Sequence, residues 1–324
     1  MCFLKKSFLL VTQIQQNMVQ NVSIIKLLLH RKCESSAETA PTIALNDGYN
    51  IPLLGLGTYG SRKDIAKMRE AVYWAIEAGY RHIDTAALYN NEREIGQGIA
   101  DAISKGLVKR EDLFITTKLW NDKHGKDQVV PAAKASLEKL GLDYVDLYLI
   151  HSTQAEKDDG SPADIDITET WLAMIEVRKQ GLARSIGVSN FKTEHLDKII
   201  SNSSVYPAVN QVEIHPWLTQ EQLVADCHGR GIAVTAYSPF GFLVKRGGSN
   251  KNEDSTLLSI AEKYGKSTNQ VVLRYLIDRH LIPIPKSTNK QRIVENMDVF
   301  DFRLTDEDIS AINKLNKNKS IFDD

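Results

Sequence analysis

The chain has 324 residues, of which 42% are hydrophobic and 25% charged, an ordinary globular mixture that can form a large buried core. The formal net charge of -1 gives no reason to expect a nucleic acid or a membrane surface as partner. No run of the sequence approaches the roughly 18 apolar residues of a membrane-spanning helix. The few cysteines lack the spacing of a metal site or a disulfide framework, so we expect a reducing, cytoplasmic location and no bound metal.

Residues 1–40 differ in composition from the rest and are predicted to be a disordered leader ahead of one domain over residues 41–324. The first 33 residues contain no Asp or Glu, yet carry Lys5, Lys6, Lys26, Arg31 and Lys32. This bias resembles a mitochondrial presequence, although such segments are usually richer in Arg and Ser. A disordered or non-functional leader is the simpler interpretation.

A β-hairpin with Asp47-Gly48 turn chemistry is predicted between residues 42–45 and 51–54. Beyond it, short apolar strands alternate with amphipathic helices to the end of the chain. The predicted strands are Leu53–Thr58, Tyr80–Thr85, Leu113–Lys118, Val145–His151, Ser185–Ser189, Ala208–Ile214, Ala233–Ser238 and Leu281–Pro285. The predicted helices are Ile65–Ala78, Glu92–Lys105, Val129–Leu140, Ile167–Gln180, Glu194–Ile200, Glu221–Gly229, Thr256–Tyr264, Asn269–Asp278 and Arg292–Phe300.

This alternation predicts an α/β fold in which helices cover a parallel sheet. Eight strands in one uninterrupted series favour a closed (β/α)8 TIM barrel, with the hairpin at the barrel floor. The segments 122–126, 152–166 and 241–254 are long for connections of this kind, and each follows a strand. We therefore expect these loops to enclose a substrate at the barrel face where active sites lie.

A glycine motif keeps a second fold open. The stretch Gly55-Leu-Gly57-Thr-Tyr-Gly60 fits G-x-G-x-x-G, follows a predicted strand and precedes a predicted helix. Asp84, near the end of the next strand, could then bind a cofactor ribose, as in a Rossmann-type dehydrogenase. Against this, the strand–helix rhythm never breaks into a second domain, and glycines also permit tight turns and close packing.

The strongest chemical signal is a set of polar residues at the ends of successive strands. Asp84 ends the second strand, with Tyr89 just beyond it; Lys118 ends the third strand and His151 the fourth. Each of these residues has an ordinary structural explanation when taken singly. In a barrel, however, the four would converge on one mouth, which predicts an active site there.

Three longer stretches, Gly79–Gly96, Gly181–Phe191 and Ile284–Asn296, carry a family resemblance. In them the chain resembles the aldo-keto reductases, with a likeness that extends over roughly residues 42–316. The resemblance implies that NADPH reduces an aldehyde or ketone, with a catalytic tetrad of Asp84, Tyr89, Lys118 and His151.

Those roles agree with the chemistry of carbonyl reduction, which needs a hydride for carbon and a proton for oxygen. A tyrosine, with a pKa of about 10, keeps its proton at neutral pH but gives it up poorly. An ammonium beside the phenol should lower that pKa and make Tyr89 a better acid. Lys118 would supply the charge, Asp84 would keep Lys118 protonated, and neutral His151 would orient the substrate oxygen.

The resemblance also implies a cofactor site, formed by Ser189, Asn190, Gln211, Tyr237, Ser238, Lys286, Ser287, Thr288, Arg292, Glu295 and Asn296. The first three would bind the nicotinamide carboxamide, Tyr237 would stack on the ring, and the segment from Lys286 to Arg292 would bind the 2′-phosphate. Glu295 and Asn296 would contact adenine. Without the family pattern, helix capping and ordinary strand packing would explain these residues equally well.

The substrate is harder to predict, because the chain departs from the family pattern where substrate would bind. Tyr59 stands where many relatives have tryptophan, residues 152–154 replace an aromatic-proline pair, and the tail is short. Tyr59, Trp120 and Phe242 could line an apolar pocket for a bulky carbonyl. Insect members of the family include ecdysteroid ketone reductases, which suggests a steroid ketone. We expect a monomer; a redox-sensing interaction protein on the same barrel, as in the potassium-channel β subunits, is the alternative.

Overall fold

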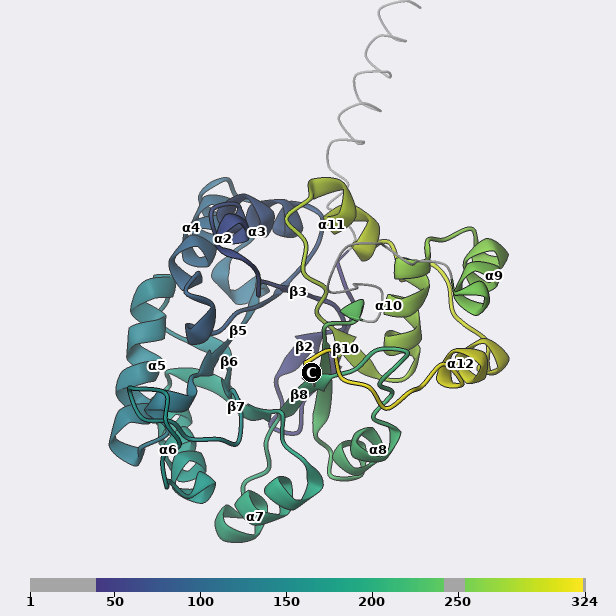
Figure 1. The fold of residues 1–324 in the computed structure, drawn as a ribbon. Helices are drawn as coiled ribbons and strands as arrows, with labels where there is room; N and C mark the ends of the chain where they lie inside the picture. Colours follow the sequence, from purple (N-terminus) through teal and green to yellow (C-terminus); the bar gives the residue numbers. More distant parts are fainter. Residues whose placement is uncertain (1–38, 242–253, 323–324) are drawn as a thin grey trace, which may run out of the picture. The chain divides into compact units, whose positions relative to one another are not determined.

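The computed structural model describes residues 39–241 and 254–322, so the leader as far as residue 38 and the predicted pocket residue Phe242 lie outside the described residues. Eight parallel strands form one sheet, in the order β10-β9-β8-β7-β6-β5-β4-β3. Figure 1 looks into the barrel and shows the strands in the middle, surrounded by helices. The strands are β3 Gly55–Gly57, β4 His82–Asp84, β5 Phe114–Leu119, β6 Val145–Ile150, β7 Ala183–Ser189, β8 Val209–Glu213, β9 Ala233–Tyr237 and β10 Leu281–Pro283.

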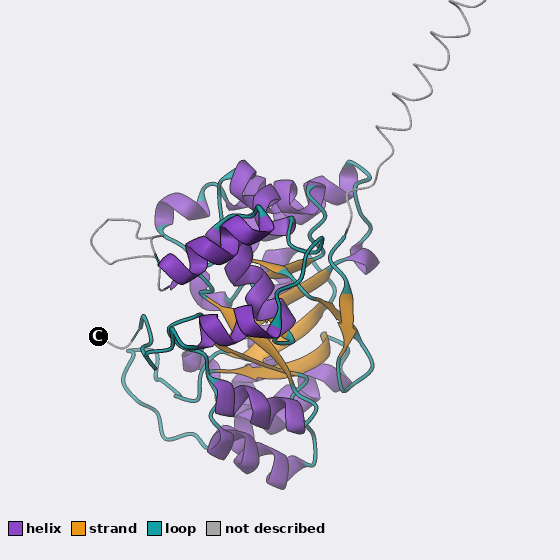
Figure 2. Ribbon diagram, turned by 90° about the vertical axis from the view of Figure 1, so that its right-hand side faces the viewer, coloured by secondary structure: helices purple, strands orange, loops and turns teal. Residues whose placement is uncertain are grey.

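The helices cover the outer face of the sheet, as the side view in Figure 2 also shows. They are α2 Arg62–Ile65, α3 Met68–Glu77, α4 Glu92–Ser104, α5 Lys126–Leu140, α6 Ile167–Lys179, α7 Thr193–Ser203, α8 Glu221–Gly229, α9 Ser255–Tyr264, α10 Thr268–Asp278, α11 Lys290–Met297 and α12 Asp306–Asn313. Their apolar faces and the outward side chains of the strands form the main hydrophobic core. The predicted (β/α)8 barrel is thus confirmed.

Closure of the barrel depends on the stretch Gly55–Gly60, which was also compatible with a Rossmann fold. Gly57 forms a parallel bridge with Lys286, and its amide donates to the Pro285 carbonyl oxygen at 3.1 Å. A Cβ on Gly57 would lie 2.5 Å from the Ile284 carbonyl oxygen, so a side chain here would prevent this approach. The glycines allow close packing between the first and last strands, and the Rossmann alternative is wrong.

The hairpin pairs β1 Thr42–Ala44 with β2 Asn50–Pro52, as predicted. Leu45 and Ile51 are buried in a second apolar cluster together with Phe114, Val209 and Ile282, which lie near the beginnings of their strands. The hairpin therefore covers the amino-terminal end of the barrel. The opposite end, where the strands finish, remains for a functional site.

The structure differs from the prediction at two helices and contains a third helix that was not predicted. The predicted helix Ile65–Ala78 is interrupted by a turn at residues 66–67 and becomes α2 and α3. The predicted helix Arg292–Phe300 lies earlier, as α11, because Asn289 accepts a hydrogen bond from the Arg292 amide and caps the helix there. Helix α12 was not predicted, although Thr305 and Asp308 form a capping box at its start.

Candidate active site

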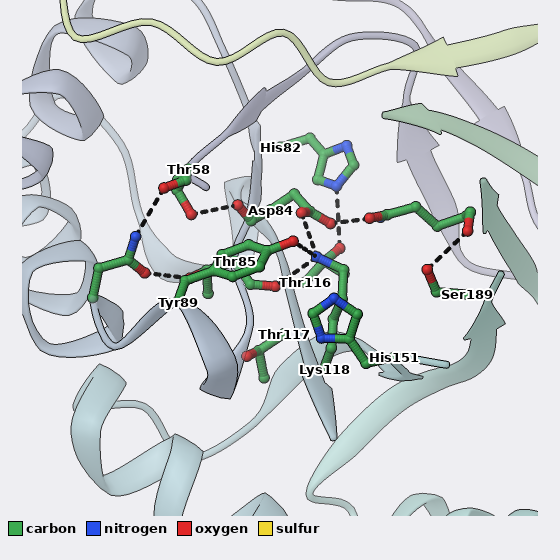
Figure 3. Close-up of polar contacts among 12 residues, drawn as sticks. Thr58, His82, Asp84, Thr85, Tyr89, Thr116, Thr117, Lys118, His151 and Ser189 are labelled. Carbon is green, nitrogen blue, oxygen red and sulfur yellow. Dashed lines mark hydrogen bonds and ion pairs between the residues drawn. The ribbon is translucent and has the colours of Figure 1, made fainter. Parts of the chain in front are cut away.

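Lys118 is the centre of the polar network at the carboxyl end of the barrel (Figure 3). It lies on β5, whose residues are all buried, and its side chain has no exposed surface. Its Nζ donates hydrogen bonds to Asp84 Oδ1 at 2.6 Å, to the Thr85 carbonyl oxygen at 2.9 Å and to Tyr89 Oη at 3.2 Å. Three acceptors therefore satisfy the three protons of a buried ammonium.

Asp84 receives a second donor from across the barrel. Gln211 Nε2, on β8, donates to Asp84 Oδ2 at 2.7 Å, and Ser189 Oγ, on β7, donates to the Gln211 carbonyl oxygen at 2.8 Å. Burial raises the pKa of Asp84, and the Lys118 ammonium and the Gln211 amide oppose that rise. Burial would lower the pKa of Lys118, but Asp84 and Tyr89 outweigh it and the net direction is upward. The lysine therefore keeps its proton.

Tyr89 ends a short 3-10 helix, Ala87–Tyr89, that follows β4 and turns the phenol back over the strand ends. Its ring centroid lies 5.0 Å from that of Tyr59 and 5.7 Å from that of His151. Burial raises the pKa of Tyr89, and the nearby Lys118 ammonium offsets only part of that increase. Lys118 thus lowers the pKa of Tyr89 as expected, but burial outweighs it, and the net direction in the protein alone is upward.

His151 directly follows β6 and faces the same space as Tyr89. Its ring centroid lies 5.0 Å from that of Trp120. Burial and the Lys118 charge lower the pKa of His151 to about 3, so the imidazole is neutral at physiological pH. Its Nδ1 has no hydrogen-bond partner among the described residues. A neutral imidazole beside a phenol can hold the oxygen of a ligand.

Asp84, Tyr89 and His151 line a cavity of about 960 Å³ at the mouth of the barrel, whereas the buried Lys118 is not among its lining residues. Residues predicted for the site that line it are Tyr59, Asp84, Tyr89, Trp120, His151, Ser189, Asn190, Gln211, Tyr237, Ser238, Lys286 and Arg292. Four predicted cofactor residues, Ser287, Thr288, Glu295 and Asn296, are not among its lining residues.

Several lining residues were missed by the sequence analysis. They are Leu88, Phe240, Asn269, Ile284, Ile321 and Phe322, together with smaller residues around the mouth. Leu88 lies within the Gly79–Gly96 signature and could have been found there. Ile321 and Phe322 belong to the tail, and no local signal shows that it returns to the barrel. There the Ile321 amide donates to Glu213 Oε1 at 2.8 Å.

The wall of the cavity fits a dinucleotide. Asn190 and Gln211 offer amide groups, and the Tyr237 ring lines the same space. The side-chain oxygen of Asn269 is buried without a partner among the described residues, as expected where a ligand would donate to it. Lys286 and Arg292 make one corner basic. This donor set suits an amide at one end and a phosphate at the other.

A carboxylate that was not predicted lies beside this basic corner. Asp64 Oδ1, from α2, is 2.8 Å from Lys286 Nζ. Burial by itself would raise the pKa of Asp64, but hydrogen bonds from Lys286 and Ser61 lower it to about 2. The sequence offered one signal for this residue, the spacing of Ser61 and Asp64, which form a capping box.

Among residues 39–241 and 254–322, no group of His, Cys, Asp or Glu side chains could hold a metal ion. None of the described helices is both long and apolar enough to cross a membrane.

The family of the chain follows from comparison with known sequences. The model of the Aldo/keto reductase family matches residues 53–317. The chain is 59% identical over 295 residues to Aldo-keto reductase AKR2E4 of Bombyx mori, which covers 89% of this chain and 96% of the relative. It is 43% identical over 294 residues to Aldose reductase B of Dictyostelium discoideum, with 86% and 93% covered.

Solved structures agree with the sequence comparison. The crystal structure of the Bombyx mori aldo-keto reductase AKR2E4 in complex with NADP is similar, with a TM-score of 0.86 at 59% identity, covering 89% of this chain and 96% of that chain. The structure of the aldo-keto reductase AKR2E5 complexed with NADPH has a TM-score of 0.84 at 41% identity, with 88% and 90% covered.

Proposed function

The chain belongs to the aldo/keto reductase family, and we propose on that premise that it reduces aldehydes or ketones to alcohols with NADPH. The observation that carries the proposal is the buried Lys118 ammonium, 2.6 Å from Asp84 and 3.2 Å from Tyr89. Both of these partners line a cavity large enough for cofactor and substrate. NADPH, when bound, supplies the hydride that the carbonyl carbon accepts.

The proton comes from Tyr89. Its raised pKa keeps the phenol protonated at neutral pH, ready to donate to the oxygen that becomes negative. The charge left on the phenol oxygen is stabilised by the Lys118 ammonium, and Asp84 keeps that ammonium charged and in place. Neutral His151 donates a hydrogen bond that orients the carbonyl oxygen towards Tyr89.

When the cofactor is bound, Ser189, Asn190 and Gln211 would hold its carboxamide and the Tyr237 ring would lie against the nicotinamide. The basic corner binds the adenosine 2′-phosphate, which favours NADPH over NADH. The residues assigned to that corner are Lys286, Ser287, Thr288 and Arg292, and those assigned to the adenine are Glu295 and Asn296. Ser238 is assigned to the cofactor site as a whole.

We propose a bulky ketone as substrate, with an ecdysteroid as the specific candidate. The support is the size of the cavity and its apolar lining by Tyr59, Leu88, Trp120, Ile321 and Phe322. Small aldehydes would leave much of this apolar surface in contact with water and gain less from its burial. The enzyme is expected to act as a cytoplasmic monomer, which size-exclusion chromatography and cell fractionation would check.

Tyr89→Phe tests the proposed proton donor. The substitution removes only the hydroxyl, so carbonyl reduction should fall by about a thousandfold or more, while the Kd for NADPH stays near that of the unchanged protein. Oxidation of NADPH at 340 nm with a panel of aldehydes, quinones and steroid ketones measures the first quantity, and fluorescence titration measures the second.

Trp74→Phe is the matched control, because it changes an aromatic side chain that packs against the core away from the cavity. If the Tyr89→Phe protein turned over at the rate of the control, Tyr89 could not be the proton donor. Faster reduction of small aldehydes than of any steroid ketone would contradict the substrate class but leave the reductase assignment intact.

A further inference from the structure

The proposed mechanism leaves Asp64 without a role, although this carboxylate touches the cofactor site. Its Oδ1 lies 2.8 Å from Lys286 Nζ and accepts a hydrogen bond from Thr288 Oγ1 at 3.4 Å. Lys286 and Thr288 are both residues proposed above for the 2′-phosphate. A carboxylate of this chain therefore engages two donors that the phosphate would use.

The local backbone holds this carboxylate in position. The other oxygen, Oδ2, accepts hydrogen bonds from the Ser61 amide and the Ser61 hydroxyl, both at 2.9 Å. The neighbouring Gly60 makes room for the pair, because a Cβ there would lie 2.8 Å from Asp64 Cβ and 3.0 Å from Lys286 Cε. The contact is thus built by the chain and is not a chance meeting of two long surface side chains.

The two cations of the basic corner differ in this respect. The side chains of Lys286 and Asp64 are only 30% and 24% exposed, so water screens their attraction less than in a surface pair. Arg292, by contrast, has no carboxylate within ion-pair distance among residues 39–241 and 254–322. Within the part of the chain that the structure describes, an incoming phosphate would meet a guanidinium without a carboxylate partner, but an ammonium that is already neutralised.

We propose that Asp64 competes with the cofactor 2′-phosphate for Lys286 and Thr288, and thereby sets how tightly the enzyme binds NADPH. A phosphate dianion carries the same kind of oxygen acceptor as a carboxylate, with more charge, so it can replace Asp64 at these donors. The exchange costs the ion pair and brings two anions close together. NADH has a hydroxyl in place of the phosphate and avoids this cost. The inference rests on the proposed use of NADPH.

Asp64→Asn tests this competition, because asparagine keeps the shape of the side chain and an oxygen for Ser61. The Kd for NADPH, measured by fluorescence titration without any carbonyl, should fall by about threefold to tenfold, while the Kd for NADH changes by less than about twofold. Asp158→Asn is the matched control. It makes the same change in net charge by removing an 86% exposed carboxylate from its pair with Lys123, and it should leave both constants unchanged.

An unchanged or higher Kd for NADPH in Asp64→Asn would overturn the proposal. An equal gain for NADH would also overturn it, since the competing group could then not be the 2′-phosphate. In a Lys286→Met background the benefit of Asp64→Asn should disappear, and its persistence would count against the mechanism. Asp64→Ser serves as a second variant if asparagine unfolds the segment. Because binding is measured alone, failure of carbonyl reduction would be distinguishable from failure of this inference.

Discussion

At the scale of single residues, burial decides the charge of several groups that carry chemistry. Lys118 has no exposed side-chain surface, yet remains an ammonium because Asp84 and two further oxygen acceptors surround it. Tyr89 and His151 are held neutral by the same burial, with the pKa of the phenol raised and that of the imidazole lowered to about 3. The site therefore combines one fixed positive charge with two neutral groups that can donate protons or hydrogen bonds.

Two histidines outside the catalytic network should make folding sensitive to acid. Burial, with help from Lys118, lowers the pKa of His82 to about 3, and burial lowers that of His124 to about 4. Both folded values lie below the unfolded value of 6.5, so the unfolded chain binds more protons as the pH falls below 6.5. The stability contributed by the neutral rings is present above that pH and is lost as the pH falls towards 4 and 3.

We expect His124→Leu to reduce this acid sensitivity. Each buried histidine should lower the free energy of unfolding by up to about 2 kcal/mol between pH 7 and pH 5. Since leucine cannot be protonated, the difference between the two pH values should shrink by about that amount in the variant. Urea denaturation at both pH values measures the change. An identical difference in the variant and the unchanged protein would mean that His124 does not titrate as inferred.

At the scale of elements, close contacts between helices depend on glycine. Gly96, inside α4, faces the end of α5, and a Cβ there would lie 2.2 Å from the Leu140 carbonyl oxygen. The carbonyl belongs to the backbone and cannot move without shifting the helix. The same glycine ends the Gly79–Gly96 signature, so that part of the signature reflects helix packing.

Gly96→Ala should therefore destabilise the protein, even though alanine favours a helix more than glycine does. Overpacking at the α4–α5 contact is expected to cost about 1–3 kcal/mol in the free energy of unfolding. Gly229→Ala is the matched control: Gly229 also lies in a helix, as the last residue of α8, and has nothing within 4 Å of its Cβ position. That control should be neutral or stabilising by up to about 1 kcal/mol. Equal stabilities in chemical denaturation would contradict the packing argument.

At the scale of the whole molecule, the hairpin covers one end of the barrel and leaves the other end for chemistry. The described part begins at Thr39, and Ala40 is already buried, while the Pro41 carbonyl oxygen accepts a hydrogen bond from the Leu53 amide. Residues 40 and 41 thus pack with the domain, and we propose residue 38 as the end of the leader in place of residue 40.

A protein that starts at Thr39 is thus expected to keep the kcat/KM of the full chain within about twofold, because the described residues that line the cavity all lie between Gly57 and Phe322. A protein that starts at Leu45 lacks β1 and should lose stability. Thermal melting and NADPH oxidation would measure both. A large loss of activity on removing residues 1–38 would show that the leader takes part in folding or function.

Much of the fold could be predicted from periodicity, because each strand and helix must bury its own apolar face. The eight strands were placed within a few residues of their observed ends. Helix α12 was missed, although Ile309 and Ile312 pack against the core and the helix also meets α9 through polar contacts, among them Lys263 with Asp308 at 2.7 Å. Boundaries set by caps, as at Asn289, were also misplaced.

The sequence by itself determined the barrel and the convergence of Asp84, Tyr89, Lys118 and His151, because parallel strands bring their carboxyl ends to one mouth. Only the tertiary structure decided which groups meet there from distant segments. Gln211 reaches Asp84 across 127 positions, and Thr288 reaches Asp64 across 224. Such contacts depend on side-chain packing and on the low local dielectric, neither of which a local pattern encodes. For the same reason, burial and not the neighbouring Lys118 ammonium decides that the pKa of Tyr89 is raised.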